Sequence, residues 1–527
     1  MFKILVSDAI SEEGLKKLMD APDVQVDIRP GLPPEELKAL IGEYDALLVR
    51  SQTKVTADLL AGARNLKAVG RAGVGVDNID IEAATRRGII VVNAPDGNTI
   101  STAEHTFAML MALARNIPQA YASIQSGKWD RKSFVGVELR GKTLGIVGLG
   151  RIGTEVAKRA MAFGMTVLAY DPFLTRERAD QLGVESVSVD DICRRADFIT
   201  VHTPLTKETR HMISGPQFAL MKKGVRILNC ARGGIIDEKA LLAALEDGTV
   251  GGAALDVFEE EPPKNNPLLA SNRVIATPHL GASTVEAQIN VAIDVGEEIL
   301  NILHDRPFKN AVNLPSLPAE VMRAVQPYLT LGEKLGQLIS QIAVGRLSAI
   351  EVTYGGAVAE REVAPVSRTI LKGILSYHHG DEVNYVNAPF IAETLGIKVT
   401  ETKTGRHKVF NDWISVQLTT DEGTHSAAGT LFNGLGPRIV QIDGYSVDVA
   451  PQGTLLITRH IDQPGIIGQV GSLLGAAGVN IAAMQVGRKE LGGQAVMVLA
   501  VDKPVDAETL ANIGQVPGIL AVRDVSL

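Results

Sequence analysis

Residues 143–171 constrain the fold of this chain more than any other stretch. The apolar run Thr143–Val147 predicts a buried parallel strand, and residues 151–163 carry apolar side chains at helical intervals. A second apolar run, residues 166–170, ends on the acid Asp171. Between the first strand and the helix lies the spacing G-x-G-x-x-G, formed by Gly148, Gly150 and Gly153. This order of elements is typical of a dinucleotide-binding βαβ unit.

Each part of this unit has a physical task toward a dinucleotide. The first glycine allows the tight turn, the second lets the backbone approach a pyrophosphate, and the third lets the helix pack on the strand. The helix N-terminus offers unpaired N–H groups and the positive end of its dipole to the phosphates. Asp171 can accept hydrogen bonds from the ribose hydroxyls and would repel a 2′-phosphate. A glycine-rich turn alone need not bind anything, but the complete unit predicts NAD rather than NADP as the cofactor.

The bulk composition narrows the class of protein. At 527 residues the chain is too long for one hydrophobic core and predicts roughly three or four domains. The net charge of −8 argues against nucleic acid as a partner, and two cysteines are too few for a disulfide framework or a zinc site. The N-terminus lacks a signal-peptide pattern, and no apolar run is long enough to span a bilayer. We therefore expect a cytoplasmic protein with no metal site and no membrane contact.

The first 95 residues alternate short apolar runs with amphipathic segments, which predicts a parallel sheet with helices on both faces. The expected strands are residues 3–7, Val24–Ile28, Ala46–Val49, 66–69 and 89–92. Arg50 and Arg71 follow two of these strands, and Gly73 frees backbone N–H groups beside Arg71. Surface arginines often pair with acids, but this shared position at strand ends favours an anion site. Residues 96–120 predict one long helix, in which we expect His105 to pack or to form an interface rather than to catalyse.

Three polar side chains with complementary chemistry follow strands of the second region. Strands are expected here at residues 198–202, 226–229, 252–257 and 274–277. Arg232 offers a bidentate cation for a substrate carboxylate, and His279 titrates in the range useful for taking a hydroxyl proton. Glu261 would orient that histidine and stabilise its protonated form. A lone histidine at a strand end is more often structural, but these three groups together predict hydride transfer at the alcohol of a 2-hydroxy acid.

The motifs GLGRIG, HTPLT, NCARGG, DVFEEEP and TPHLGAS, in this order, resemble the D-isomer-specific 2-hydroxyacid dehydrogenase family. The resemblance covers roughly residues 1–315 and implies that Arg232, Glu261 and His279 are the catalytic residues. It also implies a set of residues that line the cofactor. These are Val74, Gly148, Gly150, Arg151, Ile152, Gly153, Asp171, Thr203, Cys230, Ala231, Asp256 and Gly281.

The same resemblance implies an α/β fold class with two doubly wound parallel-sheet domains. The first, a discontinuous substrate-binding domain, is expected to comprise residues 1–95 and 282–315, and the NAD-binding Rossmann domain residues 96–281. An α+β region at residues 316–450 resembles the intervening domain of long-form members of the family. A ferredoxin-like domain is expected at residues 453–527.

The last region has the order β-α-β-β-α-β, a common fold that says little about function by itself. Its sequence DQPGIIGQVGSLLGAAGVNI resembles an ACT regulatory domain, in which amino acids bind between two paired copies. His460, Asp462 and Asn480 match the positions used for serine in dehydrogenases of this type. A plain dimerisation module is the alternative.

Together these expectations define one reaction. Arg50, Arg71 and Gly73 match the substrate positions of the phosphoglycerate-binding members of the family, so we expect 3-phosphoglycerate to be oxidised to 3-phosphohydroxypyruvate with NAD. That reaction is the first step of L-serine biosynthesis, with serine as the expected effector and a homotetramer as the expected assembly. Two alternatives stay open, which are another NAD-dependent dehydrogenase acting on glycerate or lactate, and an NAD-sensing regulatory binding protein.

Overall fold

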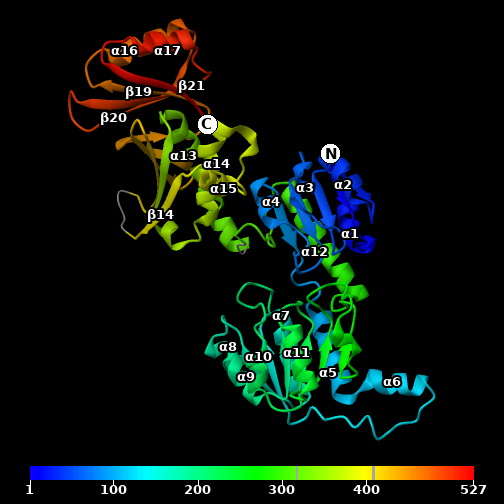
Figure 1. Cartoon of the computed structure of the whole chain (residues 1–527). Helices are drawn as coiled ribbons and strands as arrows, with labels where there is room; N and C mark the ends of the chain where they lie inside the picture. Colours follow the sequence, from blue (N-terminus) through cyan, green and yellow to red (C-terminus); the bar gives the residue numbers. More distant parts are fainter. Residues whose placement is uncertain (316–318, 406–409) are drawn as a thin grey trace.

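The computed structural model describes residues 1–315, 319–405 and 410–527, whose strands form four β-sheets with helices packed around them (Figure 1). Short 3₁₀ helices lie at Ile41–Glu43, Pro267–Ala270, Ala357–Glu360 and Gly380–Glu382. Among the helices of these described ranges, none combines the length and the hydropathy of a membrane span.

The first sheet consists of five parallel strands in the order β2-β1-β3-β4-β5. Helices α1 and α12 cover one face, and α2, α3 and α4 cover the other. Because α12 lies far along the sequence, the chain returns to this sheet after completing the second one (Figure 1). The bounds are β1 (Phe2–Val6), α1 (Glu12–Met19), β2 (Val24–Ile28), α2 (Pro34–Leu40), β3 (Ala46–Val49), α3 (Ala57–Ala61), β4 (Ala68–Arg71), α4 (Ile81–Arg86), β5 (Ile90–Asn93) and α12 (Val285–Leu303).

Strand β4 ends two residues later than the sequence predicted, so that Arg71 is its last residue. Gly70 lies just beyond the predicted strand, and a glycine inside a strand usually weakens it. Here the glycine makes room for α12, since a Cβ at this position would lie 2.6 Å from the side chain of Val295. The extension fixes the backbone of Arg71 in the sheet and leaves its side chain at the carboxyl edge.

The second sheet has seven parallel strands in the order β12-β11-β10-β9-β6-β7-β8. The order reverses between β6 and β9, which is the point where open sheets of this kind bind ligands at their carboxyl edge. Helices α5 and α7 pack on one face, and α9, α10 and α11 on the other. The bounds are α5 (Thr99–Arg115), α6 (Ile117–Gln125), β6 (Thr143–Val147), α7 (Arg151–Ala162), β7 (Thr166–Tyr170), α8 (Arg176–Leu182), β8 (Glu185–Ser186), α9 (Val189–Arg195), β9 (Phe198–Val201), α10 (Gly215–Leu220), β10 (Val225–Asn229), α11 (Glu238–Glu246), β11 (Val250–Leu255) and β12 (Val274–Ala276).

The prediction of one long helix over residues 96–120 was wrong. The structure has two helices, α5 and α6, which meet at Asn116 in the left-handed conformation with φ +52°. Asparagine adopts this conformation more readily than most residues, and Pro118 lacks the N–H that would continue the helix. As a result α6 turns away from the sheet and projects outward (Figure 1), with no buried residue of its own.

The third and fourth sheets share one hydrophobic core. The third is six-stranded, in the order β14-β13-β15-β16-β17-β18, and the fourth has the order β20-β21-β19-β22. Side chains of both sheets, including Tyr354, Val416, Ile457 and Val498, belong to a single buried cluster. The bounds are α13 (Ala319–Ile342), β13 (Leu347–Gly356), α14 (Ala364–His379), α15 (Ala388–Thr394), β14 (Lys398–Thr404), β15 (Asp412–Thr420), β16 (Thr424–Phe432), β17 (Gly436–Ile442), β18 (Tyr445–Val449), β19 (Thr454–Ile461), α16 (Ile466–Ala476), β20 (Ile481–Arg488), β21 (Gln494–Val501), α17 (Ala507–Gly514) and β22 (Ile519–Ser526).

The segment before α15 joins the third-sheet region to the first sheet. Val386 is buried in the first sheet's core, and Asn384 Nδ2 donates to the Gly88 carbonyl oxygen at 2.9 Å. The Arg86 guanidinium lies over the Phe390 ring, 4.9 Å from its centroid. Gly88 and Arg86 lie at the end of α4, the helix that follows the loop after β4. The third-sheet region therefore contacts the end of α4, the helix that follows the loop after β4.

Candidate active site and regulatory region

The glycine turn lies between β6 and α7, at the switch point of the second sheet. Gly148 has φ +97°, the left-handed conformation that the turn requires. A Cβ on Gly153 would lie 2.2 Å from the Gly148 carbonyl oxygen, so the close packing of α7 excludes any side chain there. Among the described residues nothing lies within 4 Å of the Cβ position of Gly150. The backbone at the start of α7 is therefore open to a phosphate group.

Asp171 follows β7 and is held beside this turn. Its Oδ2 accepts the Leu149 N–H and its Oδ1 the Phe173 N–H, both at 2.9 Å. Each carboxylate oxygen keeps a further lone pair, so a ribose hydroxyl can still donate to it.

Two polar atoms next to the turn lack partners within the described chain. The Thr203 Oγ1 and the His202 Nδ1 are both buried without a hydrogen bond. A Cβ on Gly148 would lie 2.9 Å from the Thr203 side chain, which shows that this residue lies against the turn. Burial lowers the pKa of His202 to about 4, so its imidazole is neutral. Because buried polar groups normally have partners, these atoms fit a site that receives a polar ligand.

The other predicted cofactor residues lie at the start of α7 or on loops around the same edge. Three of them are half-buried: Val74, Ile152 and Ala231. Arg151, at the start of α7, pairs with Asp96 through Nε and Oδ1 at 2.6 Å. Burial raises the pKa of the Cys230 thiol to about 12, so this side chain is neutral and apolar in character. Together with the glycine turn and the unpartnered Thr203, these residues fit a bound dinucleotide.

His279 and Glu261 form a dyad near the end of β12. The His279 Nδ1 lies 2.7 Å from the Glu261 Oε2, and the Phe258 N–H donates to the Glu261 Oε1 at 3.1 Å. Burial favours a higher pKa for Glu261, but the hydrogen bond and charge of His279 outweigh it and hold that pKa below its ordinary value. The carboxylate is thus ionised at neutral pH. With Nδ1 engaged, Nε2 is the nitrogen of His279 that remains for a reacting proton.

The loop that carries His279 is fixed by Asp256, which is 1% exposed. The Asp256 carboxylate accepts the N–H groups of Leu280 at 2.7 Å and Gly281 at 2.9 Å, and its carbonyl oxygen accepts the His279 N–H at 2.9 Å. Asp256 thus contacts the backbone at His279 and at the two residues that follow it. Its carboxylate orders the loop, and any contact with the cofactor would be additional to that.

Three guanidinium groups converge where the first sheet faces the second. Burial, with repulsion from Arg232 and Arg50, lowers the pKa of Arg71 to about 10, and the Arg71 Nε has no partner among the described residues. A Cβ on Gly73 would lie 1.7 Å from the Arg71 Nη1, and one on Gly75 would lie 1.7 Å from the Arg232 Nη2. The glycines after β4 therefore make room for the two arginines. This cluster of positive charge suits an anion with more than one charged group.

Sequence reasoning missed two acids that shape this cluster. The Asp8 carboxylate accepts the N–H groups of Arg50 at 2.6 Å and Thr53 at 3.0 Å, and so folds the loop after β3. Asp77 accepts from the Arg232 Nε at 3.0 Å and holds that arginine against the loop after β4. The only signal for Asp8 was an acid directly after the first strand, and its partners lie more than forty residues away.

The three residues predicted for serine do not meet within one copy of the chain. His460 is buried near the end of β19, and Asp462 just after it pairs with Arg488 at 2.9 Å. Asn480 precedes β20, and its N–H donates to the Asp502 Oδ1 at 3.1 Å. Because β20 and β19 both run antiparallel to β21, Asn480 lies at the end of the sheet where β19 begins. A ligand that touches all three residues would need a second copy of this sheet.

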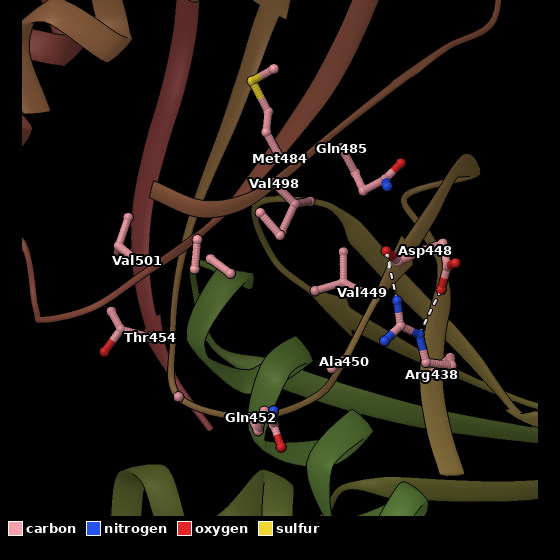
Figure 2. Close-up of a pocket in the computed structure, with 14 residues that line it drawn as sticks. Arg438, Asp448, Val449, Ala450, Gln452, Thr454, Met484, Gln485, Val498 and Val501 are labelled. Carbon is pink, nitrogen blue, oxygen red and sulfur yellow. Dashed lines mark hydrogen bonds and ion pairs between the residues drawn. The ribbon is translucent and has the colours of Figure 1, made fainter. Parts of the chain in front are cut away.

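A cavity of about 480 Å³ lies between the third and fourth sheets. Figure 2 shows Arg438 and Asp448 on one side, joined at 2.6 Å, and the apolar Val498 and Met484 on another. The lining contains no histidine, and its one cation is already paired with a carboxylate. The described groups suited to proton transfer and anion binding therefore lie elsewhere, where the first sheet faces the second.

The sequence and the fold match those of known dehydrogenases. Residues 107–281 match the NAD binding domain of the D-isomer specific 2-hydroxyacid dehydrogenases, residues 324–443 a D-3-phosphoglycerate dehydrogenase intervening domain, and residues 453–518 an ACT domain. A protein from Thermus thermophilus, TT0316, superposes with a TM-score of 0.55 at 34% identity, covering 59% of this chain and 99% of that one. A D-lactate dehydrogenase from Aquifex aeolicus, complexed with NAD and lactic acid, gives 0.52 at 29% identity, over 59% of this chain and 100% of that one. Fold and site define an NAD-dependent 2-hydroxyacid dehydrogenase.

Similarity over the full length narrows this class further. The chain is 49% identical to a D-3-phosphoglycerate dehydrogenase of Methanocaldococcus jannaschii, over 100% of both chains. It is 48% identical to that of Bacillus subtilis, again over 100% of both. It is 44% identical to a chloroplastic enzyme of Arabidopsis thaliana, over 98% of this chain and 85% of the relative. The chain belongs to the family of D-3-phosphoglycerate dehydrogenases. The expected NAD cofactor, fold class and family are confirmed.

Proposed function

We propose that this chain oxidises 3-phospho-D-glycerate to 3-phosphohydroxypyruvate with NAD, as the first step of L-serine biosynthesis. The observation that carries the proposal is the meeting of Arg50, Arg71 and Arg232 beside the dyad of His279 and Glu261. The substrate has a carboxylate at one end and a phosphate at the other. Three guanidinium groups supply matching charge for both, and the dyad supplies the base.

In this mechanism the chain binds both anionic ends of the substrate and removes one proton. Arg232 holds the carboxylate, while Arg50 and Arg71 neutralise the phosphate. The His279 Nε2 accepts the proton of the C2 hydroxyl, and the ionised Glu261 stabilises the imidazolium that results. NAD, when bound, would supply the acceptor for the hydride that leaves C2. The glycine turn and Asp171 would hold this cofactor.

A turnover assay tests the reaction. NADH formation is followed with 3-phosphoglycerate, and with glycerate as the control that lacks the phosphate. We expect activity that requires the phosphate, and its loss in His279→Ala while NAD binding persists. Equal rates with glycerate would favour a dehydrogenase of another 2-hydroxy acid. No turnover with either substrate, despite NAD binding, would favour an NAD-sensing binding protein.

We further propose that L-serine regulates the enzyme at the fourth sheet, with His460 and Asp462 from one copy and Asn480 from a second. The separation of these residues along the sheet supports a site built from two copies. The test is the rate of NADH formation with and without serine, in the wild type and in Asn480→Ala. Inhibition that Asn480→Ala abolishes would support the site, and wild-type activity indifferent to serine would contradict it.

The proposal includes a cytoplasmic homotetramer, in which two kinds of contact pair the copies. One is the outer strand β20, and the other is α6 with the loop after it. Ile117, Tyr121 and Ile124 of α6 are more than half exposed, and Trp129 beyond it is 81% exposed, which supports a contact with a second copy. Light scattering of Tyr121→Glu tests this, since that variant should fall from tetramer to dimer. We also propose the four domains with the boundaries predicted from the sequence, which limited proteolysis tests.

A further inference from the structure

One histidine close to the proposed active site has no role in the mechanism above. His105 projects from α5, and its Nε2 lies 3.2 Å from both the Thr277 Oγ1 and the Asp256 Oδ1. The Thr277 hydroxyl in turn donates to the same Asp256 oxygen at 2.6 Å. The three side chains form a closed network, of which the His105 side chain is only 20% exposed.

The network continues directly into the loop of His279. Asp256 receives the N–H groups of Leu280 and Gly281, and its carbonyl oxygen receives the N–H of His279. Burial favours a higher pKa for Asp256, but the hydrogen bonds of His105, Thr277 and the Leu280 N–H outweigh it and hold that pKa below its ordinary value. The Asp256 side chain is therefore an ionised and buried carboxylate. Each hydrogen bond that it accepts offsets part of the cost of removing its charge from water.

The backbone of His279 is in a conformation that the surrounding structure must enforce. Its φ is +55°, in the left-handed region that costs a residue with a side chain roughly 1–2 kcal/mol. Such a conformation persists only where its surroundings hold it. Here the carboxylate and the carbonyl oxygen of Asp256 hold the loop, and the Thr102 hydroxyl of α5 donates to the Gly281 carbonyl oxygen at 3.2 Å. His105 is the side chain of α5 that reaches the Asp256 carboxylate. Thr277 and the loop N–H groups all belong to the segment that is being held.

We propose that His105 is a positioning residue, which fixes the Asp256 carboxylate and Thr277 and through them the orientation of His279 toward the substrate hydroxyl. The inference rests on the proposed function, because it concerns how well the base of that reaction is aimed. His105 acts through Asp256 and does not touch the substrate. Misplacement of a reacting group by about 1 Å can slow a reaction by about a hundredfold.

The test compares His105→Leu with His105→Gln in the full-length enzyme. Glutamine can present an N–H donor close to where the histidine Nε2 lies, whereas leucine fills space without any donor. We expect His105→Leu to lower kcat by roughly ten- to a hundredfold, with the Kd for NAD changed far less. The primary deuterium isotope effect on kcat, measured with substrate deuterated at C2, should rise because the chemical step becomes slower. His105→Gln should recover most of the rate.

The control variant is Glu104→Gln, an exposed neighbour on the same helix, which should behave as the wild type. Wild-type kcat in His105→Leu would overturn the inference. So would a loss of rate that matches the fraction of misfolded protein, with an unchanged isotope effect, or a His105→Gln variant as slow as His105→Leu. If the wild type turns over glycerate instead, the proposed substrate fails, and the same comparison made with glycerate still decides the role of His105.

Discussion

The positive charge of Arg71 favours binding of an anion but destabilises the folded protein in its absence. Arginine ordinarily has a pKa of about 12.5, and in the folded chain burial and the two neighbouring arginines lower it to about 10. At neutral pH the group is protonated in both the folded and the unfolded chain. A lowered pKa therefore means that the charged form is less stable in the fold, by about 3 kcal/mol at ~1.36 kcal/mol per pKa unit. This cost is present at neutral pH and is relieved only as the pH rises through the lowered pKa.

We therefore expect Arg71→Met to stabilise the first sheet and to abolish binding of the substrate. The chain has several domains, so a single melting temperature would not isolate the effect, and native-state hydrogen exchange of the β4 amides is the better assay. With 3 kcal/mol as the upper limit, exchange should slow by up to about a hundredfold. Arg50→Met is the matched control, since it removes only one neighbour of the buried arginine and should give a smaller gain.

Addition of 3-phosphoglycerate provides the second arm of this experiment. An anion that binds the folded protein stabilises it, so exchange in the wild type should slow on addition of the substrate, whereas exchange in Arg71→Met should not respond. Faster exchange in Arg71→Met than in the wild type would refute the reasoning, because it would mean that the arginine stabilises the unliganded fold.

Three further predictions concern the dyad, the cleft and the contact between domains. Glu261→Gln should lower kcat by roughly ten- to a hundredfold with unchanged NAD affinity, because a hydrogen bond to a charged group contributes roughly 1.5–3 kcal/mol; an unchanged kcat would contradict the dyad. Since the pKa of Glu261 is lowered, its contribution to folding stability is present above a pH of roughly 4.5 and is lost as the pH falls through the lowered pKa. Acid-unfolding curves of the wild type and Glu261→Gln, which should converge at low pH, check this. Gly75→Ala would bring a methyl group to 1.7 Å from the Arg232 Nη2 and displace this guanidinium. The KM for 3-phosphoglycerate should therefore rise by about tenfold or more. A wild-type KM would show that the arginine can move without loss of binding. Asn384→Ala removes a contact to the end of α4 and no active-site group, so it should weaken inhibition by serine and change the uninhibited rate by no more than about twofold. An unchanged inhibition curve would show that this contact does not transmit the effect of serine to the active site.

The predictable parts of this molecule were those that repeat along the chain. The alternation of apolar runs and amphipathic segments predicted both parallel sheets, and parallel sheets collect their carboxyl ends at one edge. The loops that carry Arg232 and His279 could therefore be assigned to one site from the sequence alone. The break at Asn116 and the extension of β4 beyond Gly70 were not predictable in this way, because a tolerated left-handed turn and a helix arriving from residues 285–303 decide them.

The roles of side chains whose partners are distant in the sequence could not be predicted either. His105 was expected to pack or to form an interface, and only the folded chain brings it to Asp256 across more than a hundred residues. The roles of Asp8 and Asp77 likewise depend on Arg50 and Arg232, which lie in loops after distant strands. Local patterns carry information about period, turns and the common edge of a parallel sheet, but they do not show which individual side chains of distant segments come into contact.

The single core under the third and fourth sheets bears on how such an enzyme can change over evolution. A domain that meets its neighbour through a thin polar surface can be gained, lost or exchanged as a unit. Here the face of the ACT sheet with Leu455, Ile457 and Val525 is part of the same buried cluster as the intervening domain. Deleting the last domain would strip the cover from that core, and grafting it elsewhere would expose an apolar sheet. The shared core therefore favours changing the two regions as one unit, and the smallest regulatory fragment to express is both of them together.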